Sequence, residues 1–216
     1  MKYEWKKQEK ILYGAKGTPC VLTVPPQNFI MIEGEGDPNG EDFSRRVSAL
    51  YSLAYAIKMG YKKCGIAKQA EINDFAVYPL EGVWDKTADG PQLVKQSLQY
   101  TIMLCQPSLV TQEMVAAALE SVKSKKPSEL YAQIRFAAIH EGLCVQMLHT
   151  GPYDDEPASF CAMDAFIAQN GLVRTERRHR EIYLTNANRV AKEKQKTILR
   201  VRVKKEGQDG ADAGPR

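Results

Sequence analysis

The sequence predicts an α+β fold made of two related halves, and three observations support this prediction. The chain has 216 residues, which suffices for one larger domain or for two small fused ones. Strand-like and helix-like stretches recur in the same order in both halves. A turn rich in Gly, Pro and Asp precedes the main helix of each half. We therefore expect two small antiparallel sheets, each carrying a helix, related by a pseudo-twofold axis.

Composition narrows the class of protein. The formal net charge is only +4, from 30 basic and 26 acidic residues, so no strong basic field indicates a nucleic-acid partner. The five cysteines are odd in number and widely spaced, which is typical of reduced thiols in an intracellular protein. The polar N-terminus is not a signal peptide, and no apolar run approaches the roughly 20 residues of a membrane span. We expect a soluble cytoplasmic protein.

The first half begins with a predicted hairpin and continues through a helix into two further strands. The hairpin strands are CVLTV (20–24) and NFIMIEG (28–34), joined by Pro-Pro-Gln, and the helix is 41–59 with Gly60 as its stop. The two later strands are DFAVYPL (74–80) and QYTIMLC (99–105), with a loop at 81–92 between them. We expect these two strands to pair antiparallel, because their connection does not easily hold a crossover helix.

The second half repeats this order. Its strands are IRFAAI (134–139), LCVQMLH (143–149), HREIYLT (179–185) and KTILRVRV (196–203), and its helix is 158–171. The last two strands are also expected to pair antiparallel.

The segments outside the repeats have simpler assignments. Thr111 is positioned to cap a connecting helix over 112–126, and Pro127 starts a second short helical stretch. Residues 3–12 predict a short helix packed on the outside, and the Gly- and Asp-rich tail 205–216 predicts disorder. The organisation is thus one domain, 1–204, made of repeats at about 18–107 and 134–204 with a helical connector at 108–133.

The stretch HREIYLTN (179–186) alternates like a strand and raises the question of function. Ile182 and Leu184 share one face, while Glu181 and Tyr183 share the other. A carboxylate and a phenol two residues apart are compatible with a solvated sheet surface and equally with a pocket wall that grips a ligand.

Four segments together carry a resemblance to a known family. They are FIMIEGEGDPNG (29–40), VYPLEGVW (77–84), GLCVQMLHTGPYDDEP (142–157) and HREIYLTNANRVAKEKQKTILRVRV (179–203). Their order resembles the GyrI-like (gyrase-inhibitor-like) small-molecule-binding domain family in a stand-alone form, over about residues 15 to 204. The resemblance implies a tandem βαββ duplication, with antiparallel sheets, helices and a pocket between the repeats.

The resemblance also implies a function and two alternatives. The family binds flat, apolar, often cationic aromatic compounds, and serves as the effector domain of multidrug-responsive regulators when a DNA-binding module is attached. The few residues before the first strand cannot hold a helix-turn-helix, so direct DNA binding is not expected. A subfamily of stand-alone members hydrolyses the strained cyclopropane of DNA-alkylating natural products in an aromatic cage. A module that interacts with a protein such as gyrase is the third possibility.

The candidate site residues follow from the resemblance together with the residue types. Glu181 matches the acidic pocket residue of the family and is the candidate counter-ion or base, with Tyr183 beside it. Trp84, expected in a Gly-flanked loop, is the candidate stacking wall, with core packing as its alternative. The remaining candidate ligand contacts, for each of which a core or surface role stays open, are Tyr51, Tyr55, Tyr153 and Phe136.

Other chemistries find little support in the sequence. His140, His149 and His179 are isolated and have no zinc-ligand spacing to any cysteine, so no metal is expected. The GEGDPNG turn lacks the Lys-Ser/Thr of a phosphate loop, and no cofactor is expected. The partner predicted by the sequence is a small aromatic molecule. Its identity and the oligomeric state stay open.

Overall fold

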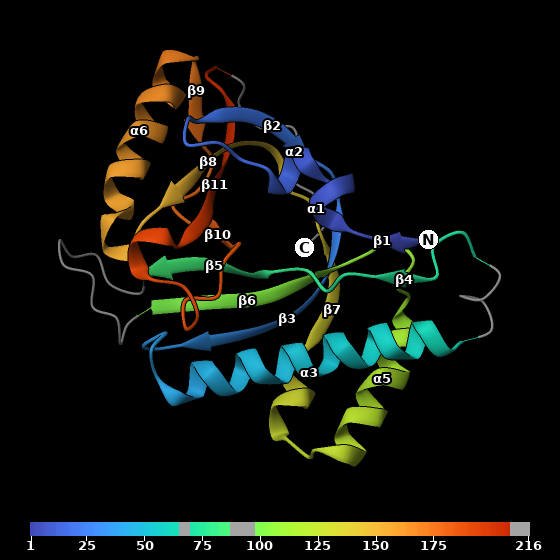
Figure 1. Ribbon diagram of the computed structural model, residues 1–216. Coiled ribbons are helices and arrows are strands. Elements are labelled where there is room, and N and C mark those ends of the chain that lie inside the picture. The colour runs from blue at the N-terminus through green and yellow to red at the C-terminus, as the bar shows by residue number, and fades with distance from the viewer. Residues whose placement is uncertain (65–69, 87–97, 208–216) are drawn as a thin grey trace.

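The computed structural model describes residues 1–64, 70–86 and 98–207, and within them nine strands form one sheet. The strand order is β2-β8-β11-β10-β5-β6-β3-β7, with β9 added beside β11, and all of these pairings are antiparallel. Helices α3 and α6 pack on this sheet, and the connecting helix α5 packs beside α3 (Figure 1). The predicted α+β class is confirmed.

The elements have the following bounds. The strands are β1 Lys2–Tyr3, β2 Cys20–Val24, β3 Gln27–Glu35, β4 Asp74–Phe75, β5 Leu80–Lys86, β6 Leu98–Gln106, β7 Arg135–Ile139, β8 Gly142–Thr150, β9 Leu172–Arg174, β10 His179–Tyr183 and β11 Lys196–Lys205. The helices are α1 Trp5–Gln8, α2 Lys10–Tyr13, α3 Glu41–Lys63, α5 Gln112–Lys125 and α6 Glu156–Gln169. Short 3₁₀ turns are η2 Glu129–Gln133, η3 Tyr153–Asp155 and η4 Lys192–Lys194.

Each repeat contributes one βαββ unit to the sheet. The first unit is β3-α3-β5-β6 and the second is β8-α6-β10-β11. Strands β5 and β10 pair with each other, so the two units share one continuous sheet instead of the two separate sheets expected from the sequence. The junction between the repeats is therefore a hydrogen-bonded seam.

The two predicted hairpins do not form, because the repeats exchange their first strands. β2 pairs with β8 of the second repeat, and β7 pairs with β3 of the first. Pro25 and Pro26 have fixed φ angles and no backbone N–H, so they cannot make the tight primed turn of a two-residue hairpin and instead carry the chain across. The sequence predicts the strands correctly but assigns them the wrong partners.

The strand expected at 74–80 is also displaced. Only Asp74 and Phe75 are extended there, and they pair in parallel with β1. The strand that pairs antiparallel with β6 is β5, which begins where the predicted one ends. The segment EGVWDK is consequently strand, not loop, up to Lys86, and residues 87–92 of the predicted loop lie outside the described residues.

Other sequence assignments hold with small changes at the ends. β10 and β11 pair antiparallel as predicted. Thr111 caps α5 by accepting a hydrogen bond from the Met114 backbone N–H. Helix α3 continues past Gly60 to Lys63, because Tyr61 in the last turn packs on Phe75 at a ring distance of 5.9 Å. The predicted disordered tail lies outside the described residues from 208 onward.

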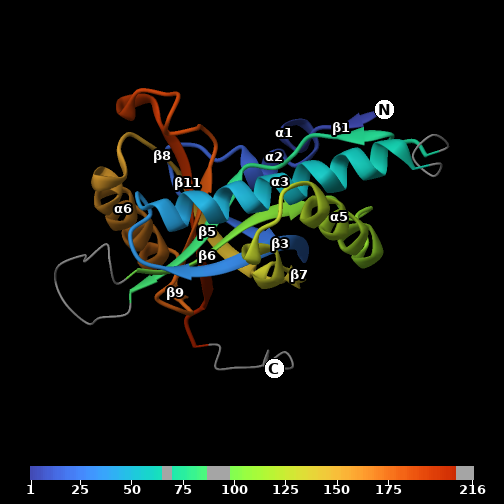
Figure 2. The ribbon, with the colours of Figure 1, turned by 90° about the horizontal axis from the view of Figure 1, so that it is seen from below.

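Both faces of the sheet are covered, and the register shows which residues share a face. Directly paired residues of an antiparallel sheet point to the same side. Ile32 of β3 pairs with Ile102 of β6, and Glu181 of β10 pairs with both Gly82 and Leu199. Helices α3 and α6 both pack on this side, whereas α1 and α2 cover part of the other. Seen from below, α3 crosses in front of the sheet (Figure 2).

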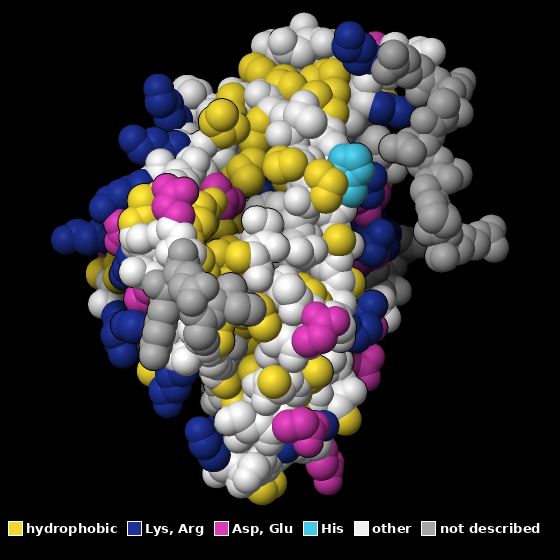
Figure 3. Space-filling model, turned by 90° about the vertical axis from the view of Figure 1, so that its right-hand side faces the viewer, with side chains coloured by type: hydrophobic (Ala, Val, Ile, Leu, Met, Phe, Trp, Pro, Cys, Tyr) yellow, Lys and Arg dark blue, Asp and Glu magenta, His cyan; other side chains and the backbone are white. Residues whose placement is uncertain are grey.

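One face of the molecule and the described helices bear on charge and on membrane spans. The face drawn in Figure 3 intermixes basic, acidic and apolar side chains, so neither sign of charge covers it. Among the described helices, none combines the length and the apolar character that crossing a bilayer requires.

Candidate functional site

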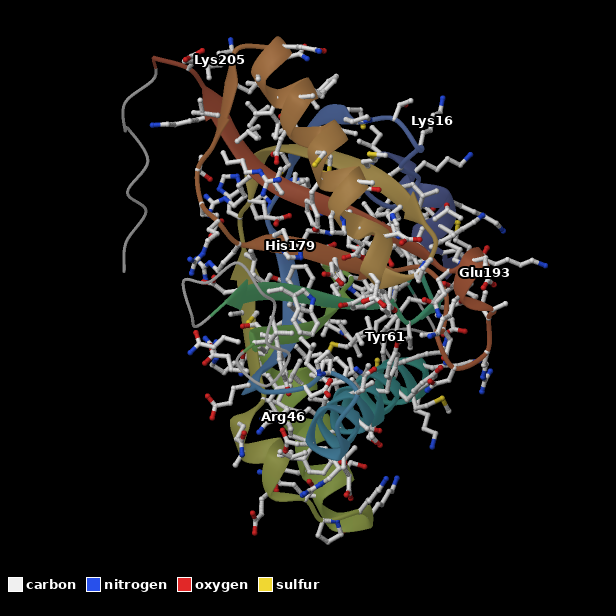
Figure 4. All side chains as sticks on the ribbon, turned by 90° about the vertical axis from the view of Figure 1, so that its left-hand side faces the viewer. Lys16, Arg46, Tyr61, His179, Glu193 and Lys205 are labelled. Carbon is white, nitrogen blue, oxygen red and sulfur yellow. The ribbon has the colours of Figure 1, made fainter. Side chains whose placement is uncertain are left out.

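Glu181 lies at the seam between the two repeats, on the helix-covered side of the sheet. Its neighbours across the strand ladders are Gly82 of the first repeat and Leu199 of the second. Only 8% of Glu181 is exposed, so this face of β10 is not a wet surface. His179 is on the same strand as Glu181, and in the view of Figure 4 it lies between α6 above and α3 below.

A chain of hydrogen bonds ends on the Glu181 carboxylate. The Trp84 indole N–H donates to the Tyr183 hydroxyl at 2.8 Å, and that hydroxyl donates to Glu181 Oε2 at 2.8 Å. His179 Nε2 lies 2.9 Å from Glu181 Oε1. Burial and the charge of Glu181 raise the pKa of the Tyr183 hydroxyl well above its ordinary value, so Tyr183 is a hydrogen-bond donor, not a base. We call Glu181, Tyr183, His179, Trp84 and Tyr153 the seam site.

Trp84 reaches this chain because its strand contains a glycine two residues earlier. A Cβ added at Gly82 would lie 2.6 Å from the Trp84 indole nitrogen, so the indole folds back over a position where only glycine fits. In the sequence, Gly82 favours a loop at this position. In the sheet, the missing side chain of Gly82 leaves the space in which the Trp84 ring lies on its own strand.

Aromatic rings hold Trp84 from the side of the first repeat. Phe43, in the first turns of α3, stacks on the indole with ring centroids 6.0 Å apart, and Tyr100 of β6 lies 5.3 Å away. Phe43 and Tyr100 are themselves in edge contact at 5.1 Å. The indole is only 7% exposed in this arrangement. These contacts hold the Trp84 ring in one orientation.

The second repeat closes the other side through η3 and α6. The Tyr153 ring meets the Tyr183 ring edge-on at 6.0 Å, and Phe160 meets His179 edge-on at 4.8 Å. Tyr153 is 42% exposed, so it forms the outer border of the site. Burial and the charges of Glu181 and Glu156 raise the pKa of Tyr153 to about 12, which keeps its hydroxyl neutral.

The remaining sequence candidates fall at different distances from the seam. Tyr51 packs on the first core cluster together with Leu80, the first residue of β5. Tyr55 is 55% exposed and touches Tyr51 at a ring distance of 6.5 Å. Phe136 lies far from the seam. Its strand β7 is four strands from β10, about 19 Å at the usual strand spacing.

Two residues of the site were missed by sequence reasoning. His179 has no metal-ligand partner in the sequence, but it precedes Glu181 by two residues and therefore shares its face of the strand. The sequence places Glu156 in the turn before the helix, whereas in the structure it begins α6. It is 7% exposed, and its Oε1 has no hydrogen-bond partner among the described residues. Burial and the charges of Glu181 and Asp154 raise the pKa of Glu156 to about 9. Its spacing of three from Tyr153 was the available signal.

The opposite side of the sheet carries a different kind of polar group. Arg180, adjacent to Glu181 in sequence, is 2% exposed and pairs with Glu81 at 3.2 Å and with Glu141 at 3.1 Å. Arg200, 1% exposed, pairs with Glu141 at 3.3 Å. A cavity of about 250 Å³ opens beside these residues, lined also by Met31, Val83, Met103 and Arg202. Its buried guanidinium groups have acidic partners, and its lining also includes His179 of the seam site.

No cluster of three or more His, Cys, Asp or Glu suited to a metal ion occurs in the described part of the chain. At the junction of the two βαββ units, aromatic rings around Trp84 lie next to the buried acid Glu181. A few polar groups among aromatic rings at such a junction are typical of small-molecule-binding domains. The chain belongs to the GyrI-like small molecule binding domain family, whose model matches residues 18–204.

Solved structures agree with this membership. An uncharacterized conserved protein from Listeria innocua is 36% identical, with a TM-score of 0.86 over 94% of this chain and 100% of that one. A hydrolase from Listeria innocua is 35% identical, with a TM-score of 0.81 over the same shares. The C-terminal domain of EcmrR, at 12% identity, has the same fold with a TM-score of 0.51 over 87% of this chain and 98% of that domain. A search of curated proteins gives no match.

Proposed function

We propose that the seam site binds flat aromatic molecules that carry a positive charge, and that the protein thereby sequesters such compounds. The observation that carries this proposal is the state of Glu181. It is almost fully buried, and its only ion-pair partner within the described part of the chain is the imidazole of His179. A buried carboxylate without a lysine or arginine is costly, and a ligand cation held against the ring of Trp84 would compensate it.

Substitution of Glu181 by Gln tests this proposal, because it keeps the size of the side chain and removes its charge. Ethidium, a permanently cationic flat ring, should bind at least about tenfold more weakly to Glu181→Gln, whereas phenanthridine, its neutral ring system, should bind equally well. Fluorescence titration at pH 7.5 measures both affinities. Glu120→Gln, at a 76% exposed side chain on α5, is the matched control and should change neither. Equal loss of both ligands would refute the role of Glu181 as a counter-ion.

A second function is supported by the hydrogen bonds of Glu181 and by the likeness to a 35% identical protein described as a hydrolase. Tyr183 and His179 hold the carboxylate in one orientation, which suits a base that takes a proton from water. In that reaction the water oxygen attacks a carbon of a strained cyclopropane, a ring C–C bond breaks, and its electron pair moves into the conjugated system of the ligand.

The same Gln variant separates the two functions. Unchanged affinity for the cyclopropane compound with loss of its ring-opened product would favour Glu181 as a base. Loss of affinity for cationic ligands, with no ring-opened product from the unmodified protein, would favour binding alone. Product formation is followed by chromatography and mass spectrometry of the incubated compound.

A further inference from the structure

Glu156 begins α6 between two residues that contact the hydrogen-bond partners of Glu181. Tyr153 precedes it by three residues and contacts Tyr183, and Phe160 follows it by four residues and contacts His179. Residues three and four apart share one side of a helical segment, so Glu156 lies between these two contacts. Tyr183 and His179 are the two hydrogen-bond partners of Glu181, so Glu156 begins α6 close enough to the Glu181 carboxylate for its charge to act on Glu156.

The two carboxyl groups are in opposite situations. Glu181 has a partner on each oxygen, as an ionised carboxylate requires. Glu156 is 7% exposed, and its buried Oε1 has no partner among the described residues, so an ionised form would be left without compensation. The positive end of α6 favours an anion, but burial and the charge of Glu181 outweigh it and raise the pKa of Glu156. Glu156 therefore carries a proton in the empty site.

We propose that Glu156 is a second recognition residue of the seam site, which gives up its proton when a cationic ligand binds and so selects cations over neutral rings. This inference rests on the proposed function. A cation beside Glu181 cancels the repulsion that keeps Glu156 neutral, so ligand charge is exchanged for a proton. The charged or titratable groups that interact electrostatically with Glu156 are Glu181 and Tyr183 of β10 and Tyr153 and Asp154 of η3. Further charged or titratable groups of the same elements are His179 of β10, which contacts Phe160 of α6, Asp155 of η3, and His149 of β8, which contacts Ser159 of α6.

Calorimetric titration with ethidium at pH 8 tests the exchange without any substitution. Proton release makes the measured heat differ between phosphate and Tris, because the buffers take up the proton with different enthalpies. Ethidium affinity should also rise with pH between about 7 and 9, by up to about tenfold per pH unit, because each bound cation releases up to one proton. Phenanthridine should show neither effect.

Glu156→Gln removes the exchangeable proton while all the facing groups stay in place. Its ethidium affinity should be flat over this pH range, and its heat should be equal in the two buffers. Glu120→Gln, at the 76% exposed side chain on α5, is the control and should keep proton release. Folding of the Gln variant has its own readout. Because the folded-state pKa of Glu156 is raised to about 9, the melting temperature of the unmodified protein should fall relative to the variant as pH rises from 5 to 8.

The outcomes separate the two proposals. Ethidium binding with no proton release would overturn the role of Glu156 and leave the proposed function intact. Ethidium failing to bind at any pH would overturn both. Parallel melting temperatures of the variant and the unmodified protein from pH 5 to 8 would show that Glu156 is ionised in the empty site, which also overturns the inference.

Discussion

Glu81 and Glu181 lie on adjacent strands of one sheet, but they face opposite sides of it and meet different partners. Glu81 is fully buried, accepts a hydrogen bond from Tyr13, and pairs with the guanidinium of Arg180. Glu181 is 8% exposed and has hydroxyl and imidazole partners only. The protein neutralises one acid with its own arginine and gives the other no guanidinium or ammonium partner in the described part of the chain. The first arrangement pairs charges within the fold, and the second is the basis of the proposed binding of cationic ligands.

The largest effect should come from breaking the neutralised side. Arg180→Met leaves Glu81 and Glu141 buried beside one another with less compensation, and we expect the free energy of unfolding to fall by about 3–5 kcal/mol. Urea denaturation measures this loss. Arg178→Met, at a 56% exposed side chain paired with Glu176, is the matched control and should change stability by less than about 1 kcal/mol. A similarly small change in the free energy of unfolding for both variants would mean that the buried ion pairs of Arg180 do not stabilise the fold.

A smaller effect is expected on the ligand side. Tyr183→Phe removes the hydroxyl that donates to Glu181 and leaves the Trp84 N–H without its acceptor. The free energy of unfolding should fall by about 1–3 kcal/mol, because two buried polar groups lose a partner. The same denaturation experiment, repeated with a saturating cationic ligand, should recover part of the loss by mass action. No recovery would indicate that the ligand does not occupy this side.

The smallest effect should be seen at the border of the site. Tyr55→Ala truncates a 55% exposed ring whose recorded ring contact is Tyr51, so stability should change by no more than about 0.5 kcal/mol. Ethidium affinity should change by less than about threefold, because the ring lies outside the group that surrounds Glu181. A tenfold loss of affinity would extend the ligand site along α3 and make Tyr55 part of it.

The fold was predictable from local patterns where a strand or helix has one dominant partner. Periodicity located α3, α5 and α6 and the β10–β11 pair, because apolar spacing and a capping threonine specify such elements locally. The exchange of β2 and β7 was not predictable in this way. Both strands find their partners more than a hundred residues away, and only the two prolines after β2 argue against the local hairpin.

The candidate site was likewise predictable only in part from local patterns. The alternation of β10 predicts that Glu181 and Tyr183 point away from Ile182, and the register agrees, but both faces of this strand are buried. Alternation separates faces without saying what covers them. Gly82 misled the assignment of Trp84, because a glycine that admits a ring in a sheet and a glycine that bends a loop are alike in sequence. The spacing of three indicates that Glu156 shares a side of its segment with Tyr153, but the burial of Glu156 depends on how α6 packs on the sheet.

The exchange of β2 and β7 also sets the order in which a growing chain can acquire its binding capacity. β2, completed within the first 24 residues, has no ladder partner until residues 142–150 have been made. The seam closes later still, when His179–Tyr183 reaches β5. Pairings this distant in sequence form slowly and late, and domains generally fold as units during synthesis. An unfinished chain on the ribosome therefore has neither the acid nor the seam, and the arrival of ligand binding marks the completion of the domain.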